Sequence, residues 1–433
     1  MVRSAAEEGS ITHGRDPGLM PPAESGPPLT PEEARLRPTY AVVSLSRLRA
    51  NLLAVKEHVA GARVMAILKA NAYGHGLLAV ARCLDPDADA FGVALVEEGI
   101  ALRRVGISKP ILVFGGVWTR QIPLFLDHGL TLTVPSLARL RDVEDAAAAR
   151  HARARVHLKI DTGMERLGVH HYNAEGLLEA AARSPHVEVE GIYSHFANAD
   201  AEDLADARLQ LERFQEVLRF YERRELPVPQ RHMAGSAALL RLPESHLDLV
   251  RPGILLYGVY PYAGAPRTVA VRPALSWRSR VVYFKVVGAG SPVGYGSTWK
   301  SDHPVRVVTI PVGYGDGYFR SMSNRAQVIL RGQRHRQVGR ICMDQTMVHR
   351  LQRRRGRAHR RAGGGRRHRG GAGGVGGHDS LRDPHRGERP GTAAVRALSL
   401  ARIRQACFPS NPAEPGHFPR YDHGHRPRTP ASL

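Results

Sequence analysis

The most constraining feature of this 433-residue sequence is a repeated alternation that runs from Tyr40 to Arg251. Short apolar runs rich in β-branched residues alternate with longer stretches whose apolar residues recur at helical spacing. The runs with strand character are 41–45, 64–69, 90–95, 111–115, 130–134, 156–160, 189–195 and a weaker one at 248–253, with helical stretches such as 47–60, 96–106 and 202–224 between them. This pattern predicts a parallel sheet closed into a (β/α)8 barrel, and a doubly wound open sheet is the alternative.

The flanking sequence divides the chain further. Residues 1–38 are rich in proline, glycine and glutamate without sustained periodicity, which predicts a disordered arm ahead of a barrel domain at 39–268. After Thr268 the pattern becomes alternating apolar and polar runs separated by Gly, Pro and Ser turns, which predicts an all-β domain at 269–348. Residues 349–433 have no hydrophobic periodicity and few large apolar side chains, so we expect a disordered tail there.

The tail also explains most of the chain's charge. It holds 19 arginines and no lysine against three aspartates and two glutamates, and so carries +14 of the formal net charge of +22. A nucleic-acid-binding function through this segment is the alternative that the charge suggests, but the tail lacks interleaved aromatic residues and we disfavour it. Arginine without lysine among glycine and proline is also what a GC-rich gene yields in the wrong reading frame, and we hypothesise a frameshift near codon 349.

Other protein classes are excluded by composition. Three cysteines without a C-x-x-C pair rule out a disulfide framework and give no sign of structural zinc. Charges or prolines interrupt every apolar run before it reaches the length of a membrane span, and the first residues lack a secretory apolar segment. A cytoplasmic enzyme without a membrane partner is therefore the expectation.

The segment AILKANAYGHG (66–76) places Lys69 at the carboxyl end of a predicted strand, where barrel enzymes carry reactive groups. A lysine there, followed by a glycine-containing turn with Tyr73, could form a Schiff base with a carbonyl cofactor. The alternative is a lysine that only points into solvent.

The segment HLKIDTGMERLG (157–168) again ends a strand in polar residues, among them Lys159 and Arg166. The forked guanidinium of Arg166 could bind a carboxylate, although an ion pair with Asp161 or Glu165 is the simpler interpretation of this segment alone.

Three further strand ends carry His195, Ser236 and Arg251. The turns at Ser236 and at 253–254 offer backbone N–H groups that could bind phosphate, although helix capping by Ser236 explains its turn equally well. In the β domain, VGYGST presents Tyr295 between glycines, and GRICMDQTMV is expected to place Cys342, Met343 and Asp344 in one short strand.

These five motifs, in this order, resemble those of the alanine racemase family from about Tyr40 to Val348. The resemblance implies a barrel followed by a β domain, the cofactor pyridoxal 5′-phosphate, interconversion of L-alanine and D-alanine for peptidoglycan, and a head-to-tail homodimer. It also implies that Lys69 holds the cofactor as a Schiff base and acts as one base, while Tyr295 of the partner subunit is the opposing base. Arg251 is implied to bond the pyridine nitrogen, and His195 to link Arg251 to Tyr295.

The remaining roles come from the same resemblance. The residues implied to surround the cofactor phosphate are Tyr73, Ser236, Gly253 and Ile254. Arg166 and Met343, the latter also across the dimer, are implied to contact the substrate carboxylate. Lys159 matches a lysine that is often carbamylated in the family, and its negative charge would then orient Arg166.

The sequence departs from the family at two places. Gly235 stands where asparagine is usual, and nothing after Val348 matches the further strands or the late tyrosine that family members have. Two related hypotheses therefore stay open beside an active racemase, namely a folded relative that binds the cofactor without turnover and a racemase of serine or another small amino acid.

Overall fold

The structure, a computed structural model, describes residues 36–59, 61–350 and 392–395. Its centre is a closed sheet of eight parallel strands, in which each strand pairs with its neighbour and β5 pairs with β6 to close the ring. The eight strands are β2 (Arg63–Ile67), β3 (Ala90–Val93), β4 (Ile111–Val113), β5 (Thr131–Val134), β6 (Ala154–Asp161), β8 (Val187–Tyr193), β9 (Gln230–Gly235) and β10 (Leu249–Arg251). The short β7 (Val169–His170) extends the sheet beside β6. The predicted (β/α)8 barrel is confirmed.

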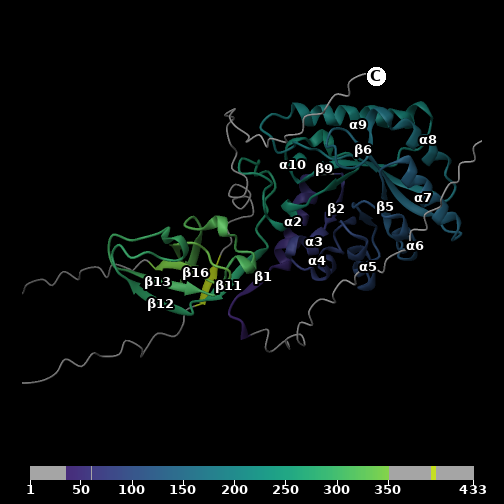
Figure 1. The fold of residues 1–433 in the computed structure, drawn as a ribbon. Helices are drawn as coiled ribbons and strands as arrows, with labels where there is room; N and C mark the ends of the chain where they lie inside the picture. Colours follow the sequence, from purple (N-terminus) through teal and green to yellow (C-terminus); the bar gives the residue numbers. More distant parts are fainter. Residues whose placement is uncertain (1–35, 60, 351–391, 396–433) are drawn as a thin grey trace, which may run out of the picture.

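Helices surround this barrel (Figure 1). They are α2 (Leu45–His58), α3 (Lys69–Gly74), α4 (Leu77–Leu84), α5 (Val96–Arg104), α6 (Ile122–Asp127), α7 (Leu137–Ala148), α8 (Glu175–Arg183), α9 (Ala205–Arg223) and α10 (Ser236–Arg241). Ser44 and Ser136 accept backbone N–H groups at the starts of α2 and α7, as helix-capping serines do. Among the described residues, no helix combines the length and apolarity that a membrane crossing requires.

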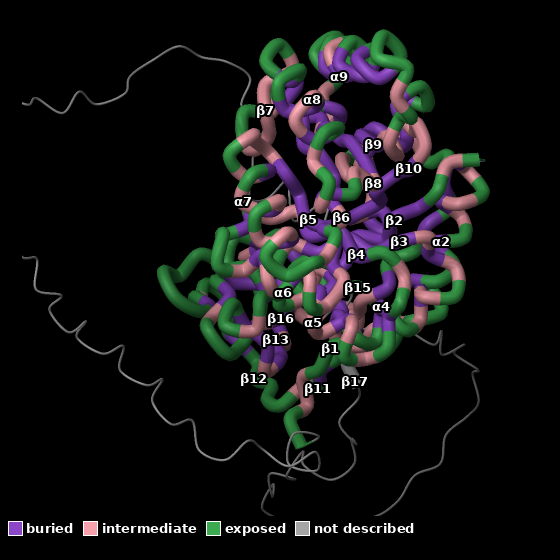
Figure 2. The backbone as a smooth tube through the Cα atoms, turned by 90° about the vertical axis from the view of Figure 1, so that its right-hand side faces the viewer, coloured by how far each residue is buried: buried purple, intermediate pink, exposed green. Residues whose placement is uncertain are grey.

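The strands of the barrel are the most deeply buried part of the molecule (Figure 2). Phe91, Phe125 and Phe214 have almost no exposed surface and belong to one core shared by the sheet and the surrounding helices. Because a parallel sheet is covered on both faces, most residues along its strands are apolar. This explains why most of them could be read from the sequence as uninterrupted apolar runs.

A separate β domain follows, as the alternating pattern predicts. Its strands are β11 (Leu275–Arg280), β12 (Tyr283–Val287), β13 (Val305–Ile310), β14 (Gln327–Leu330), β15 (Gln333–Arg336) and β16 (Thr346–Arg350). A strand β17 (Thr392–Val395) lies between β11 and β14, within the segment for which the sequence predicts no order. The other predictions for 351–433, and those for the arm at 1–35, fall outside the described residues.

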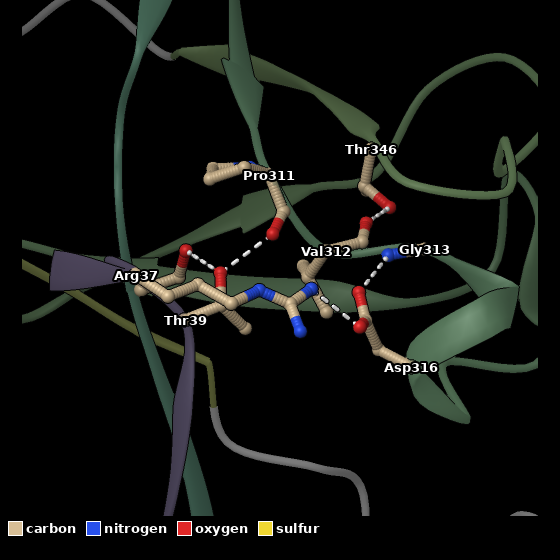
Figure 3. Close-up of polar contacts among 8 residues, drawn as sticks. Arg37, Thr39, Pro311, Val312, Gly313, Asp316 and Thr346 are labelled. Atoms are coloured by element: carbon tan, nitrogen blue, oxygen red, sulfur yellow. Dashed lines mark hydrogen bonds and ion pairs between the residues drawn. The ribbon is translucent and has the colours of Figure 1, made fainter. Parts of the chain in front are cut away.

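The first predicted strand forms, but in the other domain. β1 (Tyr40–Val43) pairs antiparallel with β11, so the β domain and not the barrel contains it. Just before it, Thr39 Oγ1 donates to Pro311 O and lies 2.8 Å from Ser279 Oγ, and Arg37 pairs with Asp316 (Figure 3). The eighth strand of the barrel is β9 instead. Its Gln, Arg and His residues interrupt the apolar run by which the other strands are predicted.

Candidate active site

A cavity of about 750 Å³ opens at the carboxyl ends of the barrel strands. Its wall includes residues that end or follow β2, β3, β4, β8, β9 and β10, such as Lys69, Phe114, His195 and Arg251. Four basic side chains line it, namely Lys69, Lys159, Arg166 and Arg251, and no aspartate or glutamate does. This imbalance of charge favours an anionic ligand.

Lys69 directly follows β2 and begins an unusual turn. The next four residues, 70–73, all have backbone angles close to φ +54° and ψ between +38° and +54°, so α3 is a left-handed turn. None of the four is glycine, and each pays roughly 1–2 kcal/mol for this conformation. Burial lowers the pKa of the Lys69 amine, Arg166 and Arg251 lower it further, and Glu98 raises it. The amine is therefore more readily deprotonated than an ordinary lysine.

Tyr73, Ser236 and Gly253 meet at one side of the cavity. Ser236 Oγ accepts from the backbone N–H of Gly253 at 2.9 Å and of Leu255 at 3.3 Å, at the start of a 3-10 turn, η4 (Ile254–Tyr257). A Cβ atom on Gly253 would lie 2.6 Å from the Tyr73 hydroxyl oxygen, so only glycine admits this approach. Hydroxyls and a turn of backbone N–H groups are the donors that a phosphate needs.

Arg251 is buried and has no carboxylate partner among the described residues. Its Nη2 donates to the carbonyls of Ser194 and Met233, and lies 3.2 Å from His195 Nδ1. Burial lowers the pKa of Arg251 to about 10, which still leaves the guanidinium protonated at neutral pH. The site therefore contains a fixed cation whose counter-charge has to come from a ligand.

A chain of hydrogen bonds leads from Arg251 to two further histidines of the barrel, His232 and His157. Nη1 of Arg251 donates to His232 Nδ1 at 2.6 Å, and His232 Nε2 lies 2.8 Å from His157 Nδ1. Because arginine only donates, His232 must carry its proton on Nε2 and donate to His157. Burial, followed by the charge of Arg251, lowers the pKa of His157 to about 3, and that of His232 lies well below its usual value. Both rings are therefore neutral in the folded protein, and His232 accepts from Arg251 through Nδ1 while it donates to His157 through Nε2.

Lys159 lines the cavity beside Tyr193. Its Nζ donates to Ile160 O at 2.7 Å and lies 5.3 Å from the centre of the Tyr193 ring. Burial lowers the pKa of Lys159 to about 7, against the opposing charge of Asp161. A substantial fraction of this amine is neutral near pH 7.

Arg166 keeps its side chain free for the cavity. Asp161 accepts from the backbone N–H groups of Gly163, Met164 and Arg166, and Glu165 pairs with His170. The sequence alone favours an ion pair of Arg166 with Asp161 or Glu165. Among the described residues, Arg166 forms neither pair. Arg166 lines the cavity instead.

The structure thus brings most of the predicted site residues to one cavity. The residues that line it are Lys69, Tyr73, Lys159, Arg166, His195, Ser236, Arg251, Gly253 and Ile254. Tyr295 and Met343 do not, since both lie in the β domain with 69% and 54% of their surface exposed. Cys342, Met343 and Asp344 also precede β16 in a bend and do not form the expected strand, because the Cys342 backbone N–H turns back to Gln345 O.

Sequence reasoning missed His157, His232 and Tyr193. His157 and Lys159 alternate along β6 and therefore project from the same face of that strand, which is a signal the sequence contained. His232 lies in β9, of which the sequence pattern predicts only the end, at Ser236, because the polar residues of Gln230–His232 interrupt the apolar run. Tyr193 stacks on His232 with ring centres 4.8 Å apart.

Known proteins match this sequence and this fold. The family model of the alanine racemase N-terminal domain matches residues 43–261, and that of the alanine racemase C-terminal domain matches 274–360. The chain belongs to the alanine racemase family. It is 43% identical to the alanine racemase of Carboxydothermus hydrogenoformans over 72% of this chain and 85% of that one. It is 44% identical to the alanine racemase of Chlorobaculum tepidum, over 71% and 82%.

Solved structures agree. The alanine racemase of Streptomyces lavendulae superimposes with a TM-score of 0.69 at 35% identity, covering 72% of this chain and 84% of that one. The resemblance inferred from the five motifs and the prediction of an amino-acid racemase are confirmed at the level of the alanine racemase family. The matched regions include every cavity residue named above, together with Tyr295 and Met343.

Proposed function

We propose that this protein interconverts L-alanine and D-alanine with pyridoxal phosphate bound in the barrel cavity. The observation that carries the proposal is the convergence of four basic side chains and no acidic one on a cavity with a lysine of lowered pKa. A phosphorylated aldehyde and an amino-acid carboxylate supply the anionic charge that this wall lacks. The aldehyde is also the group with which the amine of Lys69 can form a Schiff base.

The cavity residues fit this cofactor. Tyr73, Ser236, Gly253 and Ile254 would hold the phosphate, Lys69 would form the covalent link, and Arg251 would donate to the pyridine nitrogen. When bound, pyridoxal phosphate withdraws electrons from Cα of the amino acid and so acidifies its hydrogen. The uncompensated buried charge of Arg251 and the close approach of Tyr73 to Gly253 support this placement.

Inversion at Cα requires proton removal on one face and delivery on the other, so two bases are needed. Lys69 Nζ, with its lowered pKa, is suited to exchange the proton on one face. We propose that the second base is Tyr295 of another copy of the chain. Within a single chain, Tyr295 is exposed and does not line the cavity. The same copy would bring Met343 toward the substrate carboxylate.

Arg251 has a further effect on the outcome. It donates a hydrogen bond but keeps its own proton, and neutral His232 and His195 hold it in place. Arg251 would therefore bond a pyridine nitrogen without giving up a proton to it, which would limit the electron withdrawal and disfavour transamination. His195 is also the proposed link between Arg251 and Tyr295.

Arg166 would bind the substrate carboxylate, and Lys159 would orient Arg166. Lys159 has a neutral fraction because its pKa is about 7, so its amine can add carbon dioxide, with loss of one proton, to give a carbamate. The carbamate would place a negative charge beside the guanidinium of Arg166. We further propose that the D-alanine serves peptidoglycan synthesis in the cytoplasm.

The direct test is D-alanine formation from L-alanine by the purified chain with added pyridoxal phosphate. Formation of D-alanine with a long-wavelength absorbance from a lysine-bound cofactor is the expected result. The absorbance without turnover would indicate a cofactor-binding relative, and turnover of L-serine in preference to L-alanine a racemase of another amino acid. Neither absorbance nor turnover would overturn the proposal.

A further inference from the structure

Glu98 connects two segments of backbone at the rim of the cavity. It lies in the first turn of α5, and its Oε2 accepts from the backbone N–H groups of Ala94 at 2.9 Å and Leu95 at 3.3 Å. Its Oε1 accepts from the backbone N–H of Asn71 at 3.2 Å. One carboxylate therefore ties the turn after β2 to the start of the helix after β3.

The tied segment is the left-handed turn at 70–73, which lies between Lys69 and the Tyr73 hydroxyl. Alanine and asparagine gain nothing from this conformation locally, so contacts must hold it. Asn71 Oδ1 accepts from Leu77 N at 2.8 Å on the far side of the turn, and Glu98 holds the near side. Loss of the Glu98 carboxylate would leave the Asn71 N–H without this acceptor. The turn could then relax, and the Lys69 side chain would leave the strand in a different direction.

Glu98 also balances the charge around Lys69. The groups that act on the Lys69 amine are the cations Arg166 and Arg251 and the anion Glu98. Among the described residues, Glu98 is thus the acidic side chain that opposes the basic wall at this point. It does so from outside the cavity, since it is not part of the lining.

We propose that Glu98 is a positioning residue for Lys69, which fixes the left-handed turn by its hydrogen bond to Asn71 and places a negative charge near the Lys69 amine. This inference rests on the proposed function, because it concerns how the lysine is prepared for the cofactor. It extends the set of residues on which the site depends to one that touches neither cofactor nor substrate.

The test compares Glu98→Gln with Glu97→Gln. Both changes remove one negative charge from the first turn of α5, but Glu97 is exposed and lies beside Glu98 without bonding to Asn71. In Glu98→Gln the amide has one acceptor oxygen, so either the Asn71 N–H or the helix start faces an NH2 group. Thermal unfolding of both variants checks that the fold is intact.

The first readout does not involve the cofactor. The chain has only six lysines, so 13C-methylated lysines can be followed by NMR in the cofactor-free protein and Lys69 assigned by its loss in Lys69→Arg. We expect the Lys69 resonance to titrate at lower pH in Glu98→Gln than in the wild type, and Glu97→Gln to match the wild type. Coincident titrations of all three proteins would overturn the proposal.

The second readout uses the holoenzyme. In Glu98→Gln we expect weaker binding of pyridoxal phosphate, a fall of about tenfold or more in kcat/KM, and an acid limb of the kcat–pH profile displaced to lower pH. Adding Ala70→Gly, which removes the conformational penalty at a residue with φ of +55°, should restore cofactor affinity but not the pH profile.

If Glu98→Gln does not fold, Glu98→Asp replaces it. This variant keeps the negative charge but shortens the side chain that bonds to Asn71, so wild-type cofactor affinity in it would reject the role of that hydrogen bond. Failure of the proposed function itself would show separately, as a wild-type protein without absorbance or turnover.

Discussion

At the scale of single residues, the proposed chemistry depends on a few side chains whose surroundings change their ordinary behaviour. Lys69 is the clearest, because its amine is exposed to the cavity and yet has a lowered pKa from the surrounding protein and two nearby guanidinium groups. Proximity in the fold, and not the identity of the residue alone, makes it a candidate base.

Replacing Lys69 by alanine should abolish both racemisation and the absorbance of the bound cofactor. Lys109→Ala is the control, because Lys109 donates to Ala88 O away from the cavity lining. Chiral chromatography of the alanine product and absorbance spectroscopy measure the two effects. Retained turnover in Lys69→Ala would contradict the proposed base.

Gly253→Ala should weaken the affinity for pyridoxal phosphate by about tenfold, because the new methyl group would meet the Tyr73 hydroxyl 2.6 Å away. Gly116→Ala is a matched change in the same cavity wall, since a Cβ atom there has no neighbour within 4 Å. Cofactor titration followed by absorbance compares the two. Equal affinities would show that Tyr73 does not depend on the space at Gly253.

The residue-level predictions from sequence succeed where a motif ends a strand and fail where a contact is remote. Lys69, Ser236 and Arg251 could be placed because strand ends in a parallel barrel meet at one rim. The left-handed turn could not, because alanine and asparagine at 70–72 do not signal it and its support comes from Glu98, 27 positions from Asn71. The chain of hydrogen bonds through Arg251, His232 and His157 could not be predicted as a whole, because it joins three strands, β10, β9 and β6, that are remote in sequence.

At the scale of elements, hydrophobic pattern identifies strands but not the sheet to which each belongs. The run at 41–45 looks like any barrel strand, yet as β1 it pairs with β11 of the β domain. Partner choice depends on long-range register and on contacts such as Thr39 with Pro311, which no local pattern records.

β12 is an element with a practical consequence. It is an edge strand of the sheet β12–β13–β16, and its Tyr283 and Val286 have 60% and 63% of their surface exposed. Exposed apolar edge strands promote association between chains. We expect Val286→Lys to delay heat-induced aggregation measured by light scattering, and Val228→Lys, at an exposed apolar residue outside the strands, to have little effect. Equal aggregation of both variants and the wild type would remove β12 as the cause.

At the scale of the whole molecule, the proposed site needs two chains. Lys69→Ala and Tyr295→Phe should each be inactive alone, but mixing them under conditions that exchange subunits should restore activity. A mixed dimer contains one site with both Lys69 and Tyr295, so at most about a quarter of wild-type activity returns from a statistical mixture. No recovery, with exchange shown independently, would place both bases in one chain.

The stability of the molecule should depend on acid through its buried histidines. Above pH 6.5 His157 is neutral in both the folded and the unfolded chain, so proton binding by this residue does not change stability there. As the pH falls from 6.5 toward about 3, the unfolded histidine binds a proton that the folded one refuses, and stability decreases by up to about 1.4 kcal/mol per pH unit for this residue.

Urea unfolding at pH 7.5 and 5.0 measures this loss. His157→Gln should reduce the pH dependence, whereas His303→Gln, at an exposed histidine, should leave it unchanged. An identical loss of stability with pH in wild type and His157→Gln would show that other groups cause it.

The pairing of β1 with β11 has a consequence for synthesis. Tyr40 lies opposite Arg278, so more than 230 residues are translated between the two strands. All eight barrel strands, from Arg63 to Arg251, leave the ribosome within that interval. The barrel can therefore close before β11, the strand with which β1 pairs, has been synthesised. A nascent chain that has emerged only as far as residue 274 would hold a finished barrel with an open β domain, and the barrel cavity would be complete before the surface that carries Tyr295 has emerged.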